Sequence, residues 1–128
     1  MAVIFRNNMN GKDLPVQELV EQFLLRATEI GRHERPDGRE WRVLMRRFCV
    51  QAPAGVSRPV RNGLLTVAQS RVYMLLVLGY GNDDIYTLLE MSPQRLTNLK
   101  AAINEKLFGE RSAATLKEKL YLEMKNEE

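Results

Sequence analysis

The 128-residue chain has one cysteine, one histidine and one tryptophan, and it has no long apolar run. Because Cys49 is the only thiol, an internal disulfide and a multi-cysteine metal site are both excluded. His33 stands alone in a charged turn, with no second imidazole to share a metal. A membrane span needs about 18 to 20 apolar residues, and the apolar part of the N-terminal segment is too short for a secretory signal. We therefore expect a cytoplasmic protein without a metal or a cofactor.

The chain also lacks the sequence motifs that commonly accompany catalysis. It contains no glycine-rich phosphate loop after a strand, no nucleophile elbow and no histidine-containing metal motif. The adjacent carboxylates Asp83 and Asp84 stand at the predicted start of a helix, where negative charge offsets the helix dipole. The sequence therefore does not predict an enzyme.

Positive charge is concentrated in the first half of the chain. The net charge is only +3, but residues 1–63 carry eleven basic and seven acidic side chains, whereas residues 64–128 carry eight and nine. The densest basic group comprises Arg32, Arg35, Arg39, Arg42, Arg46, Arg47, Arg58 and Arg61. These arginines are either a solvated surface or a surface that contacts phosphate.

A first amphipathic helix is predicted after a flexible N-terminus at residues 1–12. Asp13 can cap this helix, and Pro15 is tolerated in its first turn. Apolar residues then recur at spacings of three and four as far as Ile30. The helix is expected to end near Gly31.

A second amphipathic helix is predicted to begin at Asp37. Asp37 and Glu40 form a capping-box pattern, and Arg42 and Arg46 occupy the polar side of the helix. Its apolar stripe comprises Trp41, Leu44, Met45, Phe48 and Cys49. Because few residues connect the two helices, we expect an antiparallel hairpin over residues 13–49. The surface of this hairpin is also a candidate binding site for a regulatory protein partner.

Residues 50–63 are interpreted as a linker. They contain Pro53, Gly55, Pro59 and Gly63, which we expect to interrupt both helices and central strands. The C-terminal module would then occupy residues 64–128. No segment predicts a strand long enough for a sheet, so the expected fold class is all-α.

Two helices are predicted at the start of this module. The first follows a capping box formed by Thr66 and Gln69 and ends at Gly79. The second has Asn82 as its predicted cap and is about two turns long. Its inward face comprises Ile85, Leu88 and Leu89.

A third helix presents a polar face. Ser92 is its predicted cap, Pro93 occupies its first position, and the helix ends at Gly109. The side that packs on the core comprises Leu96, Leu99, Ile103 and Leu107. The outward side comprises Gln94, Arg95, Thr97, Asn98, Lys100, Ala101, Asn104 and Lys106. Asn and Gln can pair with adenine, and Arg and Lys with guanine or phosphate, so this face suits a DNA groove.

These elements resemble the LuxR/GerE-type helix-turn-helix DNA-binding domain of bacterial transcription regulators. The resemblance covers about 43 residues, from Leu65 to Leu107. The matching positions are Leu65, Thr66, Gly79, Asn82, Ile85, Leu89, Ser92, Pro93, Leu96, Asn98, Ile103, Lys106 and Leu107. The chain departs from the family pattern at Tyr86, where the family often has Ala, and at Thr97, where it often has Lys.

The resemblance implies that the third helix enters the major groove of double-stranded DNA. The predicted DNA contacts are Ser92, Gln94, Arg95, Thr97, Asn98, Lys100, Ala101 and Lys106. The predicted phosphate contacts are Arg42, Arg46 and Arg71. A fourth helix is predicted over residues 112–124, with Ser112 as its cap. It either packs on its own core or joins two subunits in a homodimer.

The leading hypothesis is therefore a DNA-binding transcription regulator with no catalytic step. One alternative is a protein-interaction module of a regulatory complex that uses a degenerate helix-turn-helix, which the slightly acidic balance beyond residue 64 favours. Another is a promoter-binding domain similar to those of sigma factors. We expect the chain to be either the output end of a larger regulator or a small regulator by itself.

Overall fold

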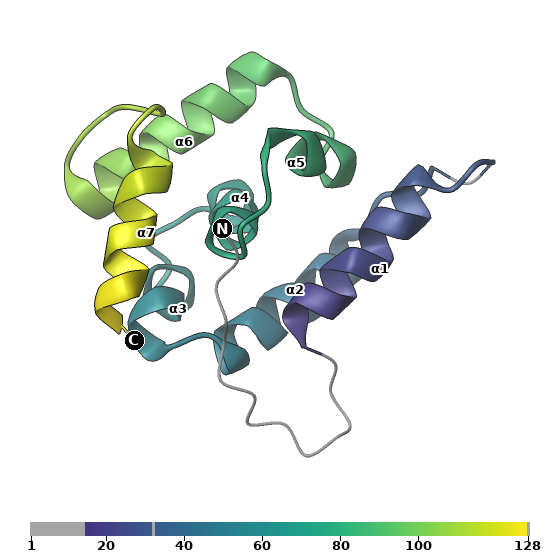
Figure 1. The fold of residues 1–128 in the computed structure, drawn as a ribbon, viewed down its shortest axis with the longest axis horizontal. Coiled ribbons are helices and arrows are strands. Elements are labelled where there is room, and N and C mark those ends of the chain that lie inside the picture. Colours follow the sequence, from purple (N-terminus) through teal and green to yellow (C-terminus); the bar gives the residue numbers. More distant parts are fainter. Residues whose placement is uncertain (1–14, 32, 128) are drawn as a thin grey trace.

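The computed structural model describes residues 15–31 and 33–127. These residues form seven α-helices and no strand (Figure 1), which confirms the all-α class. The helices are α1 (Val16–Thr28), α2 (Gly38–Gln51), α3 (Ala54–Arg61), α4 (Val67–Val77), α5 (Asn82–Leu88), α6 (Pro93–Phe108) and α7 (Leu116–Glu127). The N-terminus predicted to be flexible and the cap predicted at Asp13 lie outside the described residues. None of the described helices is long and apolar enough to cross a membrane.

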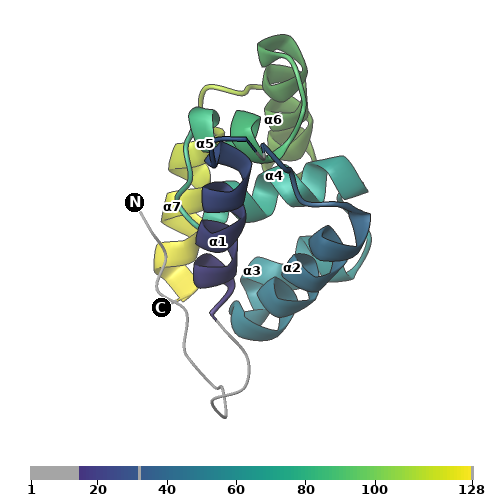
Figure 2. The same cartoon turned by 90° about the vertical axis from the view of Figure 1, so that its right-hand side faces the viewer.

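Helices α1 and α2 pack antiparallel and are joined at both ends (Figures 1 and 2). At one end, the Val16 N–H donates to Gln51 Oε1 at 2.7 Å. At the other, Arg26 Nη1 donates to Glu40 Oε2 at 2.6 Å and Arg26 Nη2 to Glu40 Oε1 at 2.8 Å. The capping box predicted from Asp37 and Glu40 is present, so Glu40 starts α2 and also fixes it to α1.

The prediction that residues 50–63 hold no helix is wrong, because α3 occupies the middle of this segment with Pro59 inside it. Val56 is only 3% exposed, and its carbonyl accepts a hydrogen bond from the Tyr73 hydroxyl of α4. The segment packs against α2 and α7. Burial and this long-range hydrogen bond stabilise a helix that proline and glycine disfavour locally.

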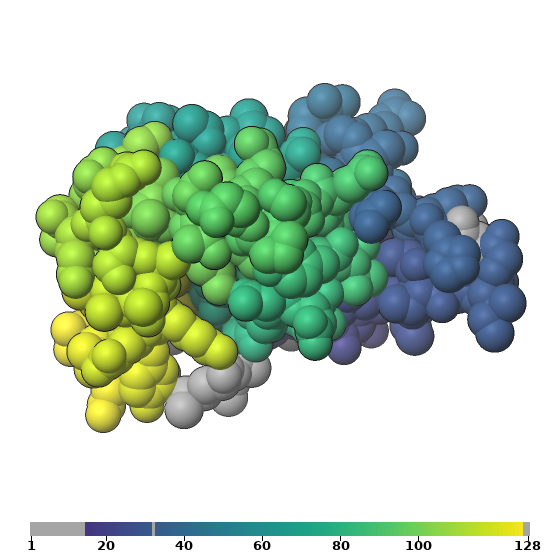
Figure 3. All heavy atoms as spheres, turned by 90° about the horizontal axis from the view of Figure 1, so that it is seen from above, coloured from purple at the N-terminus to yellow at the C-terminus, as the bar shows by residue number. Residues whose placement is uncertain are grey.

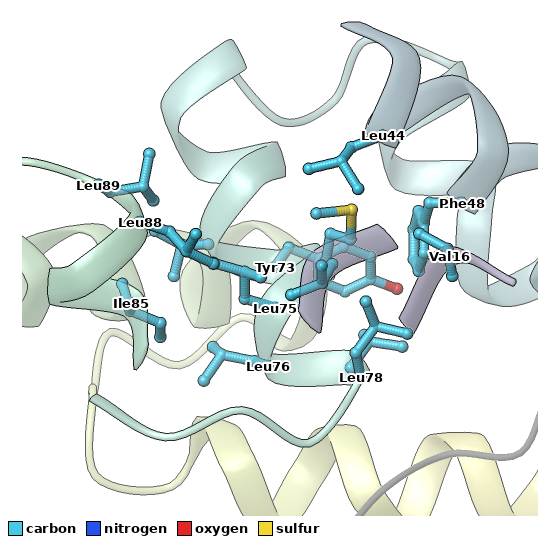
Figure 4. Close-up of a cluster of buried hydrophobic side chains, with 14 of the residues drawn as sticks. Val16, Leu44, Phe48, Tyr73, Leu75, Leu76, Leu78, Ile85, Leu88 and Leu89 are labelled. Carbon is cyan, nitrogen blue, oxygen red and sulfur yellow. The ribbon is translucent and has the colours of Figure 1, made fainter. Parts of the chain in front are cut away.

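One hydrophobic core joins the hairpin to the later helices. Figure 1 looks along α4, which has the other helices around it, and every residue from Val72 to Val77 is buried. Figure 4 shows Phe48 of α2 beside Tyr73 of α4, with an edge-to-face ring contact at 6.3 Å between centroids. The Tyr80 hydroxyl, just after α4, donates to Glu21 Oε2 of α1 at 2.8 Å. The N-terminal hairpin is thus part of the core that supports α6.

The boundaries of α4 and α5 follow local sequence with one exception. The capping box of Thr66 and Gln69 is present, and Gly79 adopts a positive φ of 93° where the chain leaves α4. The predicted capping role of Asn82 is wrong, because Gly81 is the N-cap residue and Asn82 is the first residue of α5. The Asn82 Oδ1 instead accepts a hydrogen bond from a lysine of α6, which takes its side chain away from the cap.

Helix α6 has the predicted start and end. Ser92 caps it, Pro93 is its first residue, and Gly109 ends it with a φ of 74°. Leu96 and Ile103 are fully buried and attach the helix to α4. These contacts determine which side of α6 faces away from the core.

The fourth helix of the module begins later than the sequence predicted. α7 starts at Leu116 rather than at Ser112. The Asn104 Nδ2 of α6 donates to the Ser112 carbonyl at 2.7 Å and to Thr115 Oγ1 at 2.9 Å, which holds this stretch as a loop. Leu116 and Leu120 are buried, and α7 packs against α3, α4 and α6 of its own chain.

Candidate nucleic-acid interface

The N-terminal half of α6 carries an exposed polar surface. Gln94, Arg95, Thr97 and Asn98 are all exposed, and we call these four residues the α6 polar face. Figure 3 shows this side of the molecule, with the green atoms of α5 and α6 in the middle and the blue atoms of the hairpin beside them. The helix stands at the edge of the molecule in Figure 2, so none of the other described helices covers its start.

The α6 polar face is partly ordered by hydrogen bonds of its own. The Ser92 Oγ accepts from the Arg95 N–H at 3.1 Å, so its predicted DNA contact would share an oxygen that already caps the helix. The Gln94 Nε2 donates to Asn98 Oδ1 at 3.0 Å, one helical turn away. Each carboxamide has two N–H donors and an acceptor oxygen, so this bond leaves both side chains able to pair with a base edge.

The C-terminal half of α6 is engaged with the protein itself. Lys100 is half-buried, and its Nζ donates to Asn82 Oδ1 at 2.6 Å. Burial, and to a lesser degree the nearby Lys117, lower the pKa of Lys100. The exposed Lys106 donates from Nζ to Gln69 Oε1 at 2.7 Å and to the Leu64 carbonyl at 3.1 Å. Both lysines therefore join α6 to other elements.

Two further positions on this half depart from the predicted outward face. Ala101 is half-buried, and Asn104 is 0% exposed. The placement of Asn104 on the outward face is wrong because α7 and the loop before it cover this part of α6. Helical periodicity identified the side of α6 away from α4, but it did not reveal that a later helix packs there.

The three arginines predicted to contact phosphate lie in different environments. Arg42 and Arg46 are exposed on α2. Arg71 of α4 is half-buried, and its Cζ lies 5.1 Å from the centre of the Trp41 ring. Burial lowers the pKa of Arg71. The structure therefore separates one arginine held against an aromatic ring from two that extend into solvent.

A cavity of about 360 Å³ opens beside the start of α6. We call it the arginine cavity, and its lining includes Arg35, Trp41, Arg71, Leu89, Glu90 and Arg95. These residues come from the hairpin turn, α2, α4, the turn before α6, and α6. Sequence reasoning missed this site because nothing in their spacing brings these segments together. The sequence predicted a phosphate contact for Arg71 and a DNA contact for Arg95, and it placed Arg35 in an arginine cluster, but it did not indicate that the three lie together.

Among the described residues, no three His, Cys, Asp or Glu side chains gather as metal ligands would. Burial raises the pKa of the half-buried Cys49 thiol, which makes this thiol a weaker nucleophile at neutral pH.

Comparison of the chain with protein-family models, with curated proteins and with solved structures finds no match. The geometry of α6 and its surroundings is therefore what bears on function.

Proposed function

We propose that the protein is a DNA-binding transcription regulator that reads the major groove with the N-terminal half of α6. The observation that carries the proposal is that all four residues of the α6 polar face are exposed. Leu96 and Ile103, on the opposite side of α6, are buried and hold the helix on the core. An α-helix fits the major groove, and amide and guanidinium groups match the base edges there. The resemblance to the LuxR/GerE-type domain supports the same use of this helix.

In the proposed complex, different side chains of α6 contact bases and backbone phosphates. Gln94 and Asn98, one turn apart, suit paired hydrogen bonds to adenine, and Arg95 suits guanine or phosphate. Asn82 holds the Lys100 ammonium group at the start of α5. In this position the ammonium group would contact a phosphate of the DNA backbone rather than a base. The exposed arginines of α2 extend the basic surface away from the groove.

The proposal is tested by selecting bound duplexes from a random pool at several salt concentrations. We expect the wild-type protein to enrich one motif, with affinity falling as salt rises. Asn98→Ala should relax one position of that motif and weaken binding by about 1 to 3 kcal/mol. Asn126→Ala, an exposed amide near the end of α7, is the matched control and should leave the motif unchanged. Failure of the wild-type protein to enrich any motif contradicts the proposal.

A second candidate function, a protein-interaction module, is favoured by apolar side chains on the hairpin. Leu25 is 70% exposed and Ile30 is 96% exposed, close together in sequence at the end of α1. Exposed apolar groups of this size suit a protein surface better than a nucleic acid. Under this alternative, no DNA motif is enriched, and Leu25→Ser with Ile30→Ser abolishes copurification of a specific partner that the wild-type chain retains.

A further inference from the structure

The arginine cavity has an excess of positive charge. Three arginines line it, Arg35, Arg71 and Arg95, whereas Glu90 is the one acidic residue among the described residues of its lining. No carboxylate of the described residues forms an ion pair with any of these three arginines. A pocket with unpaired guanidinium groups is a site for an anion, because each group offers several N–H donors and a permanent charge.

Arg71 is the most buried of the three arginines. It forms no hydrogen bond or ion pair with a described residue, and its Cζ lies over the Trp41 ring. Contact with an aromatic face stabilises a cation only modestly and leaves the N–H groups of the guanidinium without an acceptor. Burial also lowers the pKa of Arg71, because removal from water disfavours the charged form of the guanidinium group.

The cavity also has a definite position relative to the α6 polar face. Arg95 belongs to both, since it is the third residue of α6 and also lines the cavity. Arg35 approaches from the hairpin turn, on the side of α6 where α2 begins. An anion in the cavity would therefore lie next to whatever α6 contacts.

We propose that the arginine cavity binds a phosphate group, and that in a DNA complex this group is a backbone phosphate flanking the bases contacted by α6. The second part rests on the proposed function, whereas the first does not. The oxygens of a tetrahedral phosphate can accept hydrogen bonds from several guanidinium groups at once, and the three arginines of the lining come from three separate segments, the hairpin turn, α4 and α6. Glu90 disfavours the anion, so its replacement should tighten binding.

Phosphate binding in the arginine cavity can be followed by the fluorescence of a native residue. Trp41 is the only tryptophan, it lines the cavity, and its ring lies against Arg71. Inorganic phosphate is titrated into the full chain at constant ionic strength, with chloride as the balancing anion, while tryptophan emission is recorded. We expect a saturable change in emission. A response that chloride reproduces, or one that never saturates, overturns the phosphate site.

Three variants test whether the change in tryptophan emission comes from phosphate bound in the arginine cavity. Arg95→Gln, which leaves the Trp41 contact intact, should weaken phosphate binding about tenfold, the cost of one lost charge-assisted hydrogen bond. Glu90→Gln should tighten it a few-fold. Arg46→Gln removes an exposed arginine of α2 that does not line the cavity, and it should bind as the wild type does. Equal responses from all four proteins overturn the assignment.

A short DNA duplex distinguishes the sources of phosphate. If a backbone phosphate occupies the cavity, bound duplex changes Trp41 emission and suppresses the response to inorganic phosphate. If duplex binds but the phosphate response persists, the second part of the proposal is overturned while the first stands. If no duplex binds and inorganic phosphate does, the proposed function fails and the phosphate site remains.

Discussion

At the scale of single residues, Glu40 links helix initiation to tertiary structure. Its carboxylate accepts two hydrogen bonds from Arg26 and one from the Asp37 N–H, the last at 3.1 Å. The hydrogen bonds from Arg26, followed by that from Asp37, hold the pKa of Glu40 below its usual range. The two side chains are 22% and 28% exposed, so solvent screens the pair only in part.

This geometry predicts a pH-dependent effect of Glu40→Gln. The substitution should lower the free energy of unfolding at pH 7 by about 1 to 2 kcal/mol, because it removes a charged acceptor. A carboxyl whose pKa is lowered by folding contributes stability above its unfolded pKa of about 4.3, and the contribution is lost as pH falls through the folded value. Urea unfolding at a series of pH values should show the wild-type advantage shrinking below about pH 4. A constant advantage, or an equal loss in the exposed Glu123→Gln control, contradicts this prediction.

Asn104 and Asn98 form a matched pair on one helix. Asn104 is fully buried and donates two hydrogen bonds to the loop before α7, whereas Asn98 is exposed. Asn104→Ala should lower the free energy of unfolding by about 2 kcal/mol, because it leaves two partly buried acceptors without this donor and creates a small void. Asn98→Ala should change stability by less than about 0.5 kcal/mol. Chemical denaturation of both variants checks the difference, and similar losses would contradict the assigned burial.

At the scale of helices, local chemistry predicted most of the boundaries. The capping boxes at Asp37 and Thr66 and the end of α6 at Gly109 depend on residues a few positions apart, so the sequence alone reveals them. Sequence reasoning did not predict α3, because the helix is stabilised by burial against α2 and α7 and by a hydrogen bond from Tyr73, all of which involve residues distant in sequence. The late start of α7 was missed for the same reason, since a side chain of α6 controls it.

The end of α6 allows a test with two glycines. Gly109 has a φ of 74°, whereas Gly38, the first residue of α2, is not in the left-handed region. A Cβ at either position meets no atom within 4 Å, so only backbone conformation distinguishes them. Gly109→Ala should lower the free energy of unfolding by about 1 kcal/mol, and Gly38→Ala should raise it by about 0.5 kcal/mol. Thermal unfolding of the two variants measures this, and shifts of the same sign would contradict it.

At the scale of the whole molecule, the shared core predicts a single unfolding transition. Trp41 of the hairpin lies against Arg71 of α4, so its emission reports on the packing of the hairpin against α4, whereas far-UV circular dichroism reports on all the helices. Because α4 packs against α2 and α6, and α5 against α1, the two signals should have the same urea midpoint. An earlier midpoint for tryptophan emission would show that the hairpin unfolds independently, and would contradict the single core.

The candidate site was predictable only in part. Exposure of the α6 polar face followed from the period of Leu96 and Ile103, because the opposite side of an anchored helix faces outward. The arginine cavity could not be predicted in this way, since Arg35, Arg71 and Arg95 meet only when the hairpin packs beside α4. Sequence periodicity identifies faces of individual helices, whereas a cavity depends on how several helices are arranged.

Hydrogen bonds hold Lys106 and Lys100 to other elements of the protein. If α6 binds DNA as proposed, these bonds limit how many base pairs it can contact. The exposed stretch from Gln94 to Asn98 rises only about 6 Å along the helix axis, the length of about two stacked base pairs. Because long side chains reach beyond the helix, one protein molecule would recognise a sequence of about three or four base pairs. A sequence this short occurs many times in any genome. Selective regulation would then require two copies whose reading helices are spaced about one turn of the duplex apart.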